Sequence, residues 1–197
     1  MLRLTPVVQN LIIFNVIVFV IQVILPGLHL VEYLALWNIK TDYFRPYQLF
    51  TYMFVHEGLF HIFFNMMALS FLGPILESHW GSMRFLSFYI ICGIGAGVFN
   101  ILVDLFFGVG SFSSMIGASG AIYGILTAFG VLFPNMELRL LFPPIPIKAK
   151  YLVLILGGIA LYSGFRASPG DNTAHFAHLG GIAMSLILLQ FWRAKGL

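Results

Sequence analysis

The sequence predicts an all-α polytopic membrane protein, and two observations carry this prediction. Of the 197 residues, 60% are hydrophobic and only 9% are charged, whereas a soluble domain carries roughly 25% charged residues. The hydrophobic residues also gather into six stretches, most of them near the roughly 20 residues that a helix needs to cross a bilayer. Helices are expected because lipid offers no partner to the open edge of a sheet. We therefore expect residues 1–197 to form one membrane domain, a bundle of six transmembrane helices.

The predicted spans are separated mostly by residues that end helices. The spans are residues 8–25, 59–77, 84–107, 113–133, 149–167 and 174–192. Proline and glycine interrupt helices, and they lie between most consecutive spans, at Pro26-Gly27, Gly81-Ser82, Pro134-Asn135, Pro143-Pro144-Ile145-Pro146 and Ser168-Pro169-Gly170. The first stretch lacks a convincing small-residue cleavage site, so we interpret it as a retained anchor and not as a signal peptide.

The distribution of basic residues predicts the orientation in the membrane. With the N-terminus and the C-terminus in the cytoplasm, seven lysines and arginines fall inside: Arg3, Arg84, Arg139, Lys148, Lys150, Arg193 and Lys195. Only Lys40, Arg45 and Arg166 then fall outside, which agrees with the positive-inside bias. The net charge of +3 is dispersed along the flanks of the spans, so we expect lipid and not nucleic acid as a partner.

Four polar residues lie near the outer ends of three spans in this orientation. They are His61 and Asn65 in the second span, Ser119 in the fourth and His178 in the sixth. The spans continue about 21 Å inward from Ser119 and from His178, at about 1.5 Å per residue, in a hydrocarbon core about 30 Å thick. The serine and the histidine are therefore expected at matched depth, and ionisable groups at such depth are candidates for function.

Ser119 lies in the segment Gly117-Ala118-Ser119-Gly120, which has two interpretations. Small residues in membrane helices commonly serve close helix packing. As a nucleophile, Ser119 would gain from glycines such as Gly117 that let a substrate backbone approach. A helix that begins near Ser119 would also aim free N–H groups at a developing oxyanion. Tyr123 is four residues on and shares the face of Ser119, where it either packs or stacks on an imidazole.

Two histidines of the sixth span compete for the role of general base. His178 is favoured over His175 because the following Gly180 and Gly181 permit close approach to the fourth span. His61 and Asn65 are four residues apart and share one helical face. They are expected to donate hydrogen bonds to a negatively charged oxygen, or alternatively to a neighbouring helix.

A zinc site is the rival chemistry. The segment His56-Glu57-Gly58-Leu59-Phe60-His61 is similar to the zinc protease motif, but that motif needs its histidines four residues apart. Five residues place the two rings roughly 140° apart around a helix. We therefore expect neither a metal nor another cofactor.

Taken together, the motifs resemble the rhomboid family of intramembrane serine proteases. The resemblance covers nearly the whole chain. It rests on Gly117-Ala118-Ser119-Gly120 with Tyr123, on Ala177-His178-Leu179-Gly180-Gly181, on His61-x-x-x-Asn65, and on Glu77 with Gly81-Ser82-x-Arg84-Phe85.

The resemblance implies a six-helix bundle with a water-filled cavity that opens to the extracytoplasmic side, and a membrane-embedded loop between the first two spans. It implies a catalytic dyad of Ser119 and His178, with Tyr123 stacked on His178. His61, Asn65 and the Ser119 backbone N–H would hold the oxyanion. The implied activity is cleavage of transmembrane segments of single-span membrane proteins through an acyl-enzyme, without metal or cofactor. A prokaryotic inner membrane is the expected location, and the sequence does not indicate an oligomeric state.

Two features depart from the family pattern. The loop at residues 26–58 lacks the usual Trp-Arg pair, and Ser185 occupies a position that is often glycine. Two other classes of function stay open beside the protease. One is a catalytically silent binding or quality-control protein of the same fold. The other is a small transporter, which would be expected to carry an inverted repeat that this sequence does not show.

Overall fold

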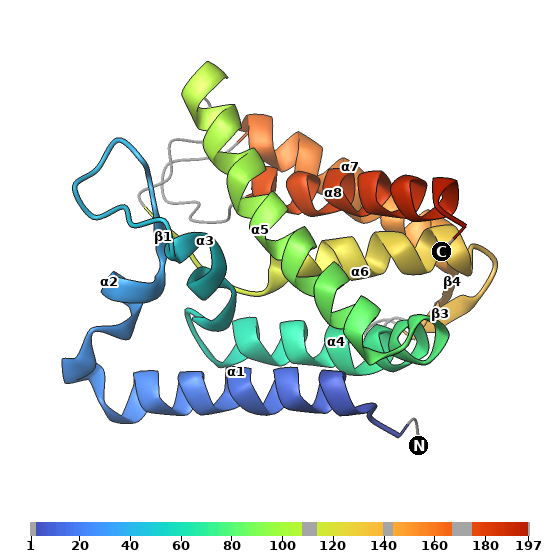
Figure 1. Cartoon of the computed structure of the whole chain (residues 1–197), viewed down its shortest axis with the longest axis horizontal. Helices are drawn as coiled ribbons and strands as arrows, with labels where there is room; N and C mark the ends of the chain where they lie inside the picture. The colour runs from blue at the N-terminus through green and yellow to red at the C-terminus, as the bar shows by residue number, and fades with distance from the viewer. Residues whose placement is uncertain (1–2, 108–113, 140–143, 167–174, 197) are drawn as a thin grey trace.

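The computed structural model describes residues 3–107, 114–139, 144–166 and 175–196, and it is an all-α helical bundle (Figure 1). Its long helices are α1 (Pro6–Ile24), α4 (Leu59–Trp80), α5 (Ser82–Phe107), α6 (Ser119–Leu132), α7 (Ala149–Arg166) and α8 (His175–Ala194). Each of the six predicted spans overlaps one of these helices. Some predicted features lie outside the described residues. They are the span ends at residues 113, 167 and 174, the proline Pro143, and the turn that begins at Ser168-Pro169-Gly170.

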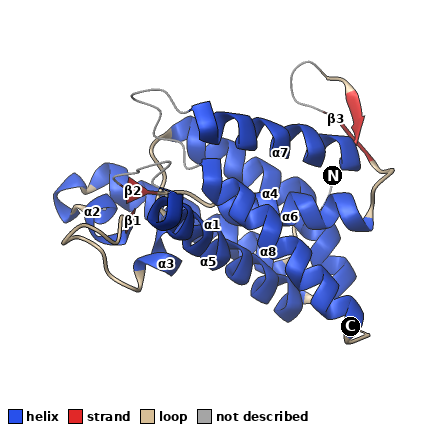
Figure 2. Cartoon of the chain, turned by 90° about the horizontal axis from the view of Figure 1, so that it is seen from above, coloured by secondary structure: helices blue, strands red, loops and turns tan. Residues whose placement is uncertain are grey.

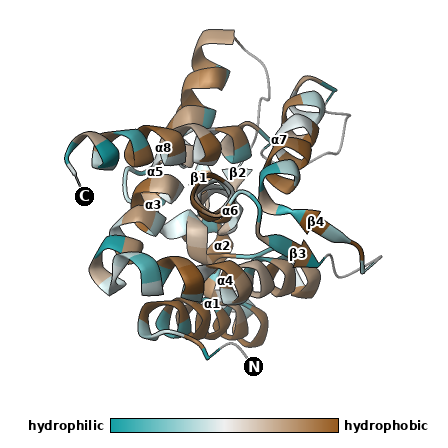
Figure 3. Cartoon of the chain, turned by 90° about the vertical axis from the view of Figure 1, so that its right-hand side faces the viewer, coloured by the Kyte–Doolittle hydropathy of each residue, from teal (hydrophilic) through white to brown (hydrophobic). Residues whose placement is uncertain are grey.

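The helices are those of an integral membrane protein. Five of them are long and apolar enough to cross a membrane, whereas α6 has only 14 residues. In the view of Figure 3, α6 is seen end-on at the centre, and the surrounding helices carry mostly hydrophobic residues. Their outer faces leave large side chains such as Ile17, Leu154 and Phe191 half exposed or more, as expected for surfaces that contact lipid.

Helix α6 begins later than the sequence predicted. Ser114 and Met115 form strand β2, and Gly117 has a positive φ of 106°, a conformation that L-residues rarely adopt. The helix therefore starts at Ser119, whereas the predicted span began at residue 113, which lies outside the described residues. Because of this delay, the serine occupies the first turn of a helix, where backbone N–H groups have no partner within the helix.

Two short antiparallel sheets were absent from the all-α prediction. Strand β1 (Leu36–Trp37) pairs with β2 (Ser114–Met115), and β3 (Glu137–Arg139) pairs with β4 (Pro146–Lys148). Figure 2 shows β1 and β2 beside α2 (Leu30–Leu34) and α3 (Gln48–Thr51), at the end of the bundle opposite β3. Short turns η1 (Pro26–Leu28) and η2 (Tyr52–Phe54) complete the loop between α1 and α4.

Gln48 holds this loop in the absence of the Trp-Arg pair. Its side chain is 1% exposed, and its Oε1 accepts hydrogen bonds from the backbone N–H groups of Trp37 and Arg45 at 3.3 and 3.0 Å. Its Nε2 donates to the carbonyls of Tyr33 and Tyr43 at 3.3 and 3.1 Å. One amide thus serves four backbone groups, and each buried backbone group needs such a partner. The loop is packed around a residue that sequence reasoning did not select.

Glu77 joins the start of α1 to the junction of α4 and α5. Its carboxylate accepts hydrogen bonds from the Val7 and Val8 N–H groups at 3.1 and 3.0 Å, from the Thr5 hydroxyl at 2.5 Å and from the Ser82 hydroxyl at 2.7 Å. Val7 and Val8 lie in the first turn of α1, where N–H groups have no partner within the helix and negative charge is favoured.

We expect Glu77→Ala to lower the free energy of unfolding by about 3 kcal/mol, because hydrogen bonds to a charged group contribute about 1.5–3 kcal/mol each and the donors would be left without a partner. Denaturant unfolding in detergent measures the change. Glu137→Ala, at an exposed position in β3, is the matched control and should unfold like the wild type. Equal unfolding curves for the two variants would contradict the assignment.

Candidate active site

Ser119 and His178 are joined by a hydrogen bond. The His178 Nε2 lies 2.8 Å from the Ser119 Oγ, and the contact is partly buried. Ser119 is the first residue of α6 and His178 lies in the first turn of α8, so the two helices bring them together at matched positions. When Nε2 carries no proton, it can accept the hydroxyl proton of the serine.

Glycines set the separation of α6 and α8. A Cβ added at Gly181 would overlap the backbone oxygen of Gly120. A Cβ at Gly120 would lie 3.7 Å from the Ala177 carbonyl oxygen of α8, and one at Gly124 would lie 3.4 Å from the Gly181 carbonyl oxygen. The helices therefore pack backbone against backbone, as small residues permit in membranes, and this approach brings the serine within reach of the imidazole.

Tyr123 fixes the plane of the His178 ring. The two rings are stacked, with centroids 4.2 Å apart and planes inclined by 6°. The ring of His175 lies edge-on to His178, at 6.2 Å and 82°. The imidazole bonded to Ser119 is thus that of His178, while His175 contacts this imidazole from the side.

His61 and Asn65 lie in the first two turns of α4. The Nδ1 of His61 accepts a long hydrogen bond from the Glu57 N–H at 3.4 Å, so in the neutral ring the proton is assigned to Nε2. This Nε2 faces Gly117, because a Cβ added there would lie only 2.5 Å from it. The Nδ2 of Asn65 donates to the His61 carbonyl at 2.9 Å, which leaves the second amide hydrogen for another acceptor.

Tyr52 supports the turn before Ser119, and sequence reasoning missed it. Its carbonyl accepts a hydrogen bond from the Gly117 N–H at 2.9 Å. Its hydroxyl donates to the Gly93 carbonyl at 2.6 Å, and burial raises the pKa of this hydroxyl far above its ordinary value. No motif marked Tyr52 in the sequence, because its role depends on contacts with residues 41 and 65 positions away.

The described residues offer no metal site. Among residues 3–107, 114–139, 144–166 and 175–196, no three histidine, cysteine or carboxylate side chains are grouped so that they could hold an ion. The His56 and His61 rings are 5.0 Å apart and edge-to-face, and the zinc alternative has no third ligand in this part of the chain.

His56 is a buried, neutral neighbour of the site, outside the membrane-spanning helices. Its side chain is fully buried, and its backbone is held by Gln22 of α1, whose Nε2 donates to the His56 carbonyl at 2.7 Å. Burial, followed by the charge of His61, lowers the pKa of His56 from 6.5 to about 4, and the Phe54 backbone offsets only part of this. The ring is therefore uncharged at neutral pH.

Acidification is expected to destabilise the protein through His56. The pKa is about 4 when folded and about 6.5 in an unfolded chain, so between these values the unfolded state binds the extra proton. The contribution of neutral His56 to the free energy of unfolding is complete above about pH 6.5. As the pH falls toward 4, this contribution is lost, by about 3 kcal/mol. Denaturant unfolding in detergent across this interval should show a smaller loss for His56→Phe, whose ring takes up no proton. Identical losses in both proteins would rule out His56 as the cause.

The fold and the site define a class: a helical membrane protein in which a serine hydroxyl is hydrogen-bonded to an imidazole, a pairing that nucleophilic acyl transfer uses. Comparison with known proteins assigns the family. Residues 43–194 match the family model of the Rhomboid domain, and the chain belongs to the rhomboid family, which includes intramembrane serine proteases.

Curated relatives come from several kingdoms. The chain is 30% identical over 134 residues to Rhomboid protein 1, mitochondrial, of Saccharomyces cerevisiae, covering 68% of this chain and 38% of that protein. It is 33% identical over 135 residues to rhomboid protease GluP of Bacillus subtilis, covering 68% and 24%. It is also 32% identical over 66 residues to inactive RHOMBOID-like protein 8 of Arabidopsis thaliana, covering 34% and 19%. The matched segments span well under half of the length of each of these relatives. One of the relatives is named a protease and another is named inactive.

Proposed function

We propose that this protein is an intramembrane serine endopeptidase that cuts the transmembrane segments of single-span membrane proteins. The observation that supports the proposal most directly is the 2.8 Å contact between the His178 Nε2 and the Ser119 Oγ. A serine hydroxyl is a weak nucleophile unless a base lies within hydrogen-bond reach. Here the base is itself oriented by the stacked ring of Tyr123.

The reaction proceeds through an acyl-enzyme. Ser119 Oγ attacks the scissile carbonyl while His178 Nε2 takes its proton, and the carbonyl oxygen becomes an oxyanion. The tetrahedral intermediate collapses, the peptide C–N bond breaks, and His178 donates the proton to the leaving amine. Water then attacks the Ser119 ester, with His178 again accepting and returning a proton. The products are a carboxylate, an amine and the free serine.

Three donors are proposed to hold the oxyanion: the Ser119 N–H, His61 and Asn65. The Ser119 N–H is free of helical partners because α6 begins there, and the helix dipole favours negative charge at this end. His61 contributes Nε2–H and Asn65 contributes its second amide hydrogen. Loss of one such donor typically costs about 10²–10³ in rate.

The substrate is proposed to enter beside α7. Only Ala149, Ala160 and Gly164 of this 18-residue helix are buried, against ten residues of the 14-residue α6. The first turn of α4 exposes Leu59 and Phe60 by 74% and 79%. A substrate helix must unwind locally before attack, because an intact helix keeps its carbonyls in hydrogen bonds. Gly117 beside the serine favours small side chains at the cut.

We propose an orientation with both termini in the cytoplasm and the site open to the extracytoplasmic side, on the basis of the seven basic residues against three. The relatives come from yeast mitochondria, plants and a bacterium, so they lend no particular support to a prokaryotic inner membrane.

The second candidate function is that of a catalytically silent binding protein of the same fold. It is supported by the match to a relative that is named inactive. Such a protein has no need of the nucleophile and base, yet both residues are in place here.

Cleavage of a single-span reporter protein in liposomes distinguishes the candidates. Wild type should cut the reporter, His178→Ala should not, and His175→Ala should retain activity, because the His175 ring is not the one bonded to Ser119. A chelator should leave the rate unchanged. An inactive wild type would favour the binding protein, and chelator-sensitive cleavage would revive the zinc alternative.

A further inference from the structure

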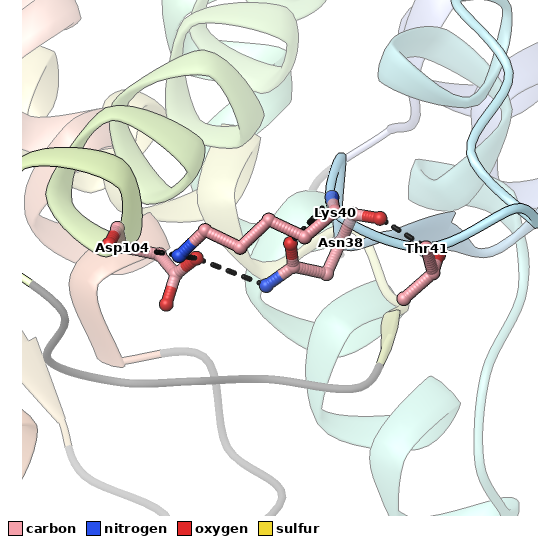
Figure 4. Close-up of polar contacts among 4 residues, drawn as sticks. All are labelled: Asn38, Lys40, Thr41 and Asp104. Carbon is pink, nitrogen blue, oxygen red and sulfur yellow. Dashed lines mark hydrogen bonds and ion pairs between the residues drawn. The ribbon is translucent and has the colours of Figure 1, made fainter.

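We propose that Asp104 and Lys40 act as positioning residues for the turn that carries Ser119. This inference rests on the proposed protease function for its kinetic test. Asp104 lies in the last turn of α5, and its side chain is 4% exposed. The Lys40 Nζ lies 2.9 Å from its Oδ2, and the same oxygen accepts a hydrogen bond from the Asn38 Nδ2 at 3.0 Å (Figure 4). A buried carboxylate needs such partners, because burial of an unpaired charge is costly.

The short loop that contains Lys40 is organised around Asn38. The Asn38 Oδ1 accepts a hydrogen bond from the Lys40 N–H at 2.9 Å, and the Asn38 carbonyl accepts one from the Thr41 hydroxyl at 2.7 Å (Figure 4). The Asn38 side chain is thus bonded at both ends, to α5 on one side and to its own loop on the other. Displacement of Lys40 or Asp104 would therefore move Asn38 as well.

Asn38 directly follows β1, and β1 is anchored to α5 at two points. A Cβ added at Gly97 would lie 3.0 Å from the Leu36 Cδ2, so Leu36 packs closely on that helix. Gly97 and Asp104 are seven residues apart, about two helical turns. The pair of contacts fixes the direction of β1 as well as its place.

Strand β1 in turn holds β2. Leu36 pairs with Met115 and Trp37 with Ser114, and β2 leads through Gly117 to Ser119. Among the described residues two pairs form this ladder, so the position of β2 depends on what holds β1, together with the Gly117 N–H bond to the Tyr52 carbonyl. The ion pair is therefore linked to the Ser119 N–H and to Gly117 through one strand pair. A displacement of about 1 Å at a reacting group can cost about 100-fold in rate.

The kinetic test uses Lys40→Met, which keeps the length of the side chain but removes its charge, and Asp104→Asn. We expect kcat to fall about 10-fold or more with little change in KM, because donors act on the transition state and not on substrate binding. Lys40→Arg should restore most of the rate. Lys148 is an exposed cation in β4. Lys148→Met is therefore the matched control, and its kcat should equal that of the wild type. Lys40→Met leaves the Asp104 carboxylate, which is 4% exposed, without its countercharge and should lower the thermal midpoint, so kcat is compared at a temperature at which every variant is fully folded.

A second readout does not require proteolysis. Hydrogen exchange of the backbone amides at residues 114–119 should be faster in Lys40→Met and Asp104→Asn than in the wild type, and unchanged in Lys148→Met. If the wild type cuts the reporter and both variants match it in kcat and exchange, the positioning role is wrong while the protease stands. If the wild type cuts nothing but exchange responds as expected, the protease proposal fails alone. A fall in kcat that tracks a loss of folded protein, without rescue by arginine, would also overturn the positioning role.

Discussion

Ser119→Ala is expected to abolish proteolysis, with kcat falling by about 10⁶-fold as when a serine protease loses its nucleophile. The hydroxyl that bonds to the His178 Nε2 at 2.8 Å is the atom that must attack the carbonyl, and no methyl group can replace it. The oxyanion donors would remain in place, but without attack by the serine no tetrahedral intermediate forms for them to stabilise. Single-turnover cleavage of a single-span reporter in liposomes measures the loss.

The control for this substitution is Ser87→Ala. Ser87 is an exposed serine of α5 whose Oγ donates to the Met83 carbonyl at 2.8 Å, away from the site, and its loss should leave the rate unchanged. Labelling with a serine-directed fluorophosphonate gives an independent readout. The wild type and Ser87→Ala should form an adduct at residue 119, and Ser119→Ala should form none. Cleavage by Ser119→Ala at the wild-type rate would refute the proposed mechanism.

The second large effect is expected from Gly181→Ala, although residue 181 takes no part in the chemistry. The added Cβ would overlap the Gly120 carbonyl oxygen and lie 3.4 Å from the Gly124 N. Both atoms belong to the backbone of α6, so relief requires α8 to move away. Because Ser119 and His178 lie on these two helices, the movement would break their hydrogen bond. We expect activity to fall by about 100-fold or more and stability by about 1–3 kcal/mol.

Gly158→Ala provides the comparison for this helix-packing effect. Gly158 lies within α7, and a Cβ added there would meet no atom within 4 Å. The change should keep activity and, since alanine favours helix over glycine by about 1 kcal/mol, should not destabilise the protein. The reporter assay and denaturant unfolding in detergent apply to both variants. Wild-type activity in Gly181→Ala would show that the dyad does not depend on this backbone contact.

The polar residues of the site were predictable because their spacing is helical. His61 and Asn65, and likewise Ser119 and Tyr123, are four residues apart, and this separation places side chains on one face. The start of α6 was less predictable. Apolar composition extended the fourth span to residue 113, whereas the positive φ of Gly117 and the pairing of β2 with β1 delay the helix to Ser119. Neither feature leaves a periodic pattern in the sequence.

The loop between α1 and α4 was the least predictable part. Its conformation depends on Gln48, which bonds to backbone groups from Tyr33 to Arg45, and on the pair of Lys40 and Asp104, which are 64 residues apart. A search for the missing Trp-Arg pair would flag this loop as doubtful. Glutamine fills the need by a different set of hydrogen bonds.

The sequence by itself determined that this chain lies in a membrane, where its long helices fall along the chain and which polar side chains share a helical face. Lipid leaves each backbone group to be bonded within its own helix, so these features follow from local composition and spacing. Only the tertiary structure decided which of two histidines bonds to Ser119, how closely α6 approaches α8, and how residues 25–58 support the turn before the serine. Those outcomes depend on contacts between distant residues, where side-chain shape and single hydrogen bonds choose among arrangements that local pattern allows equally.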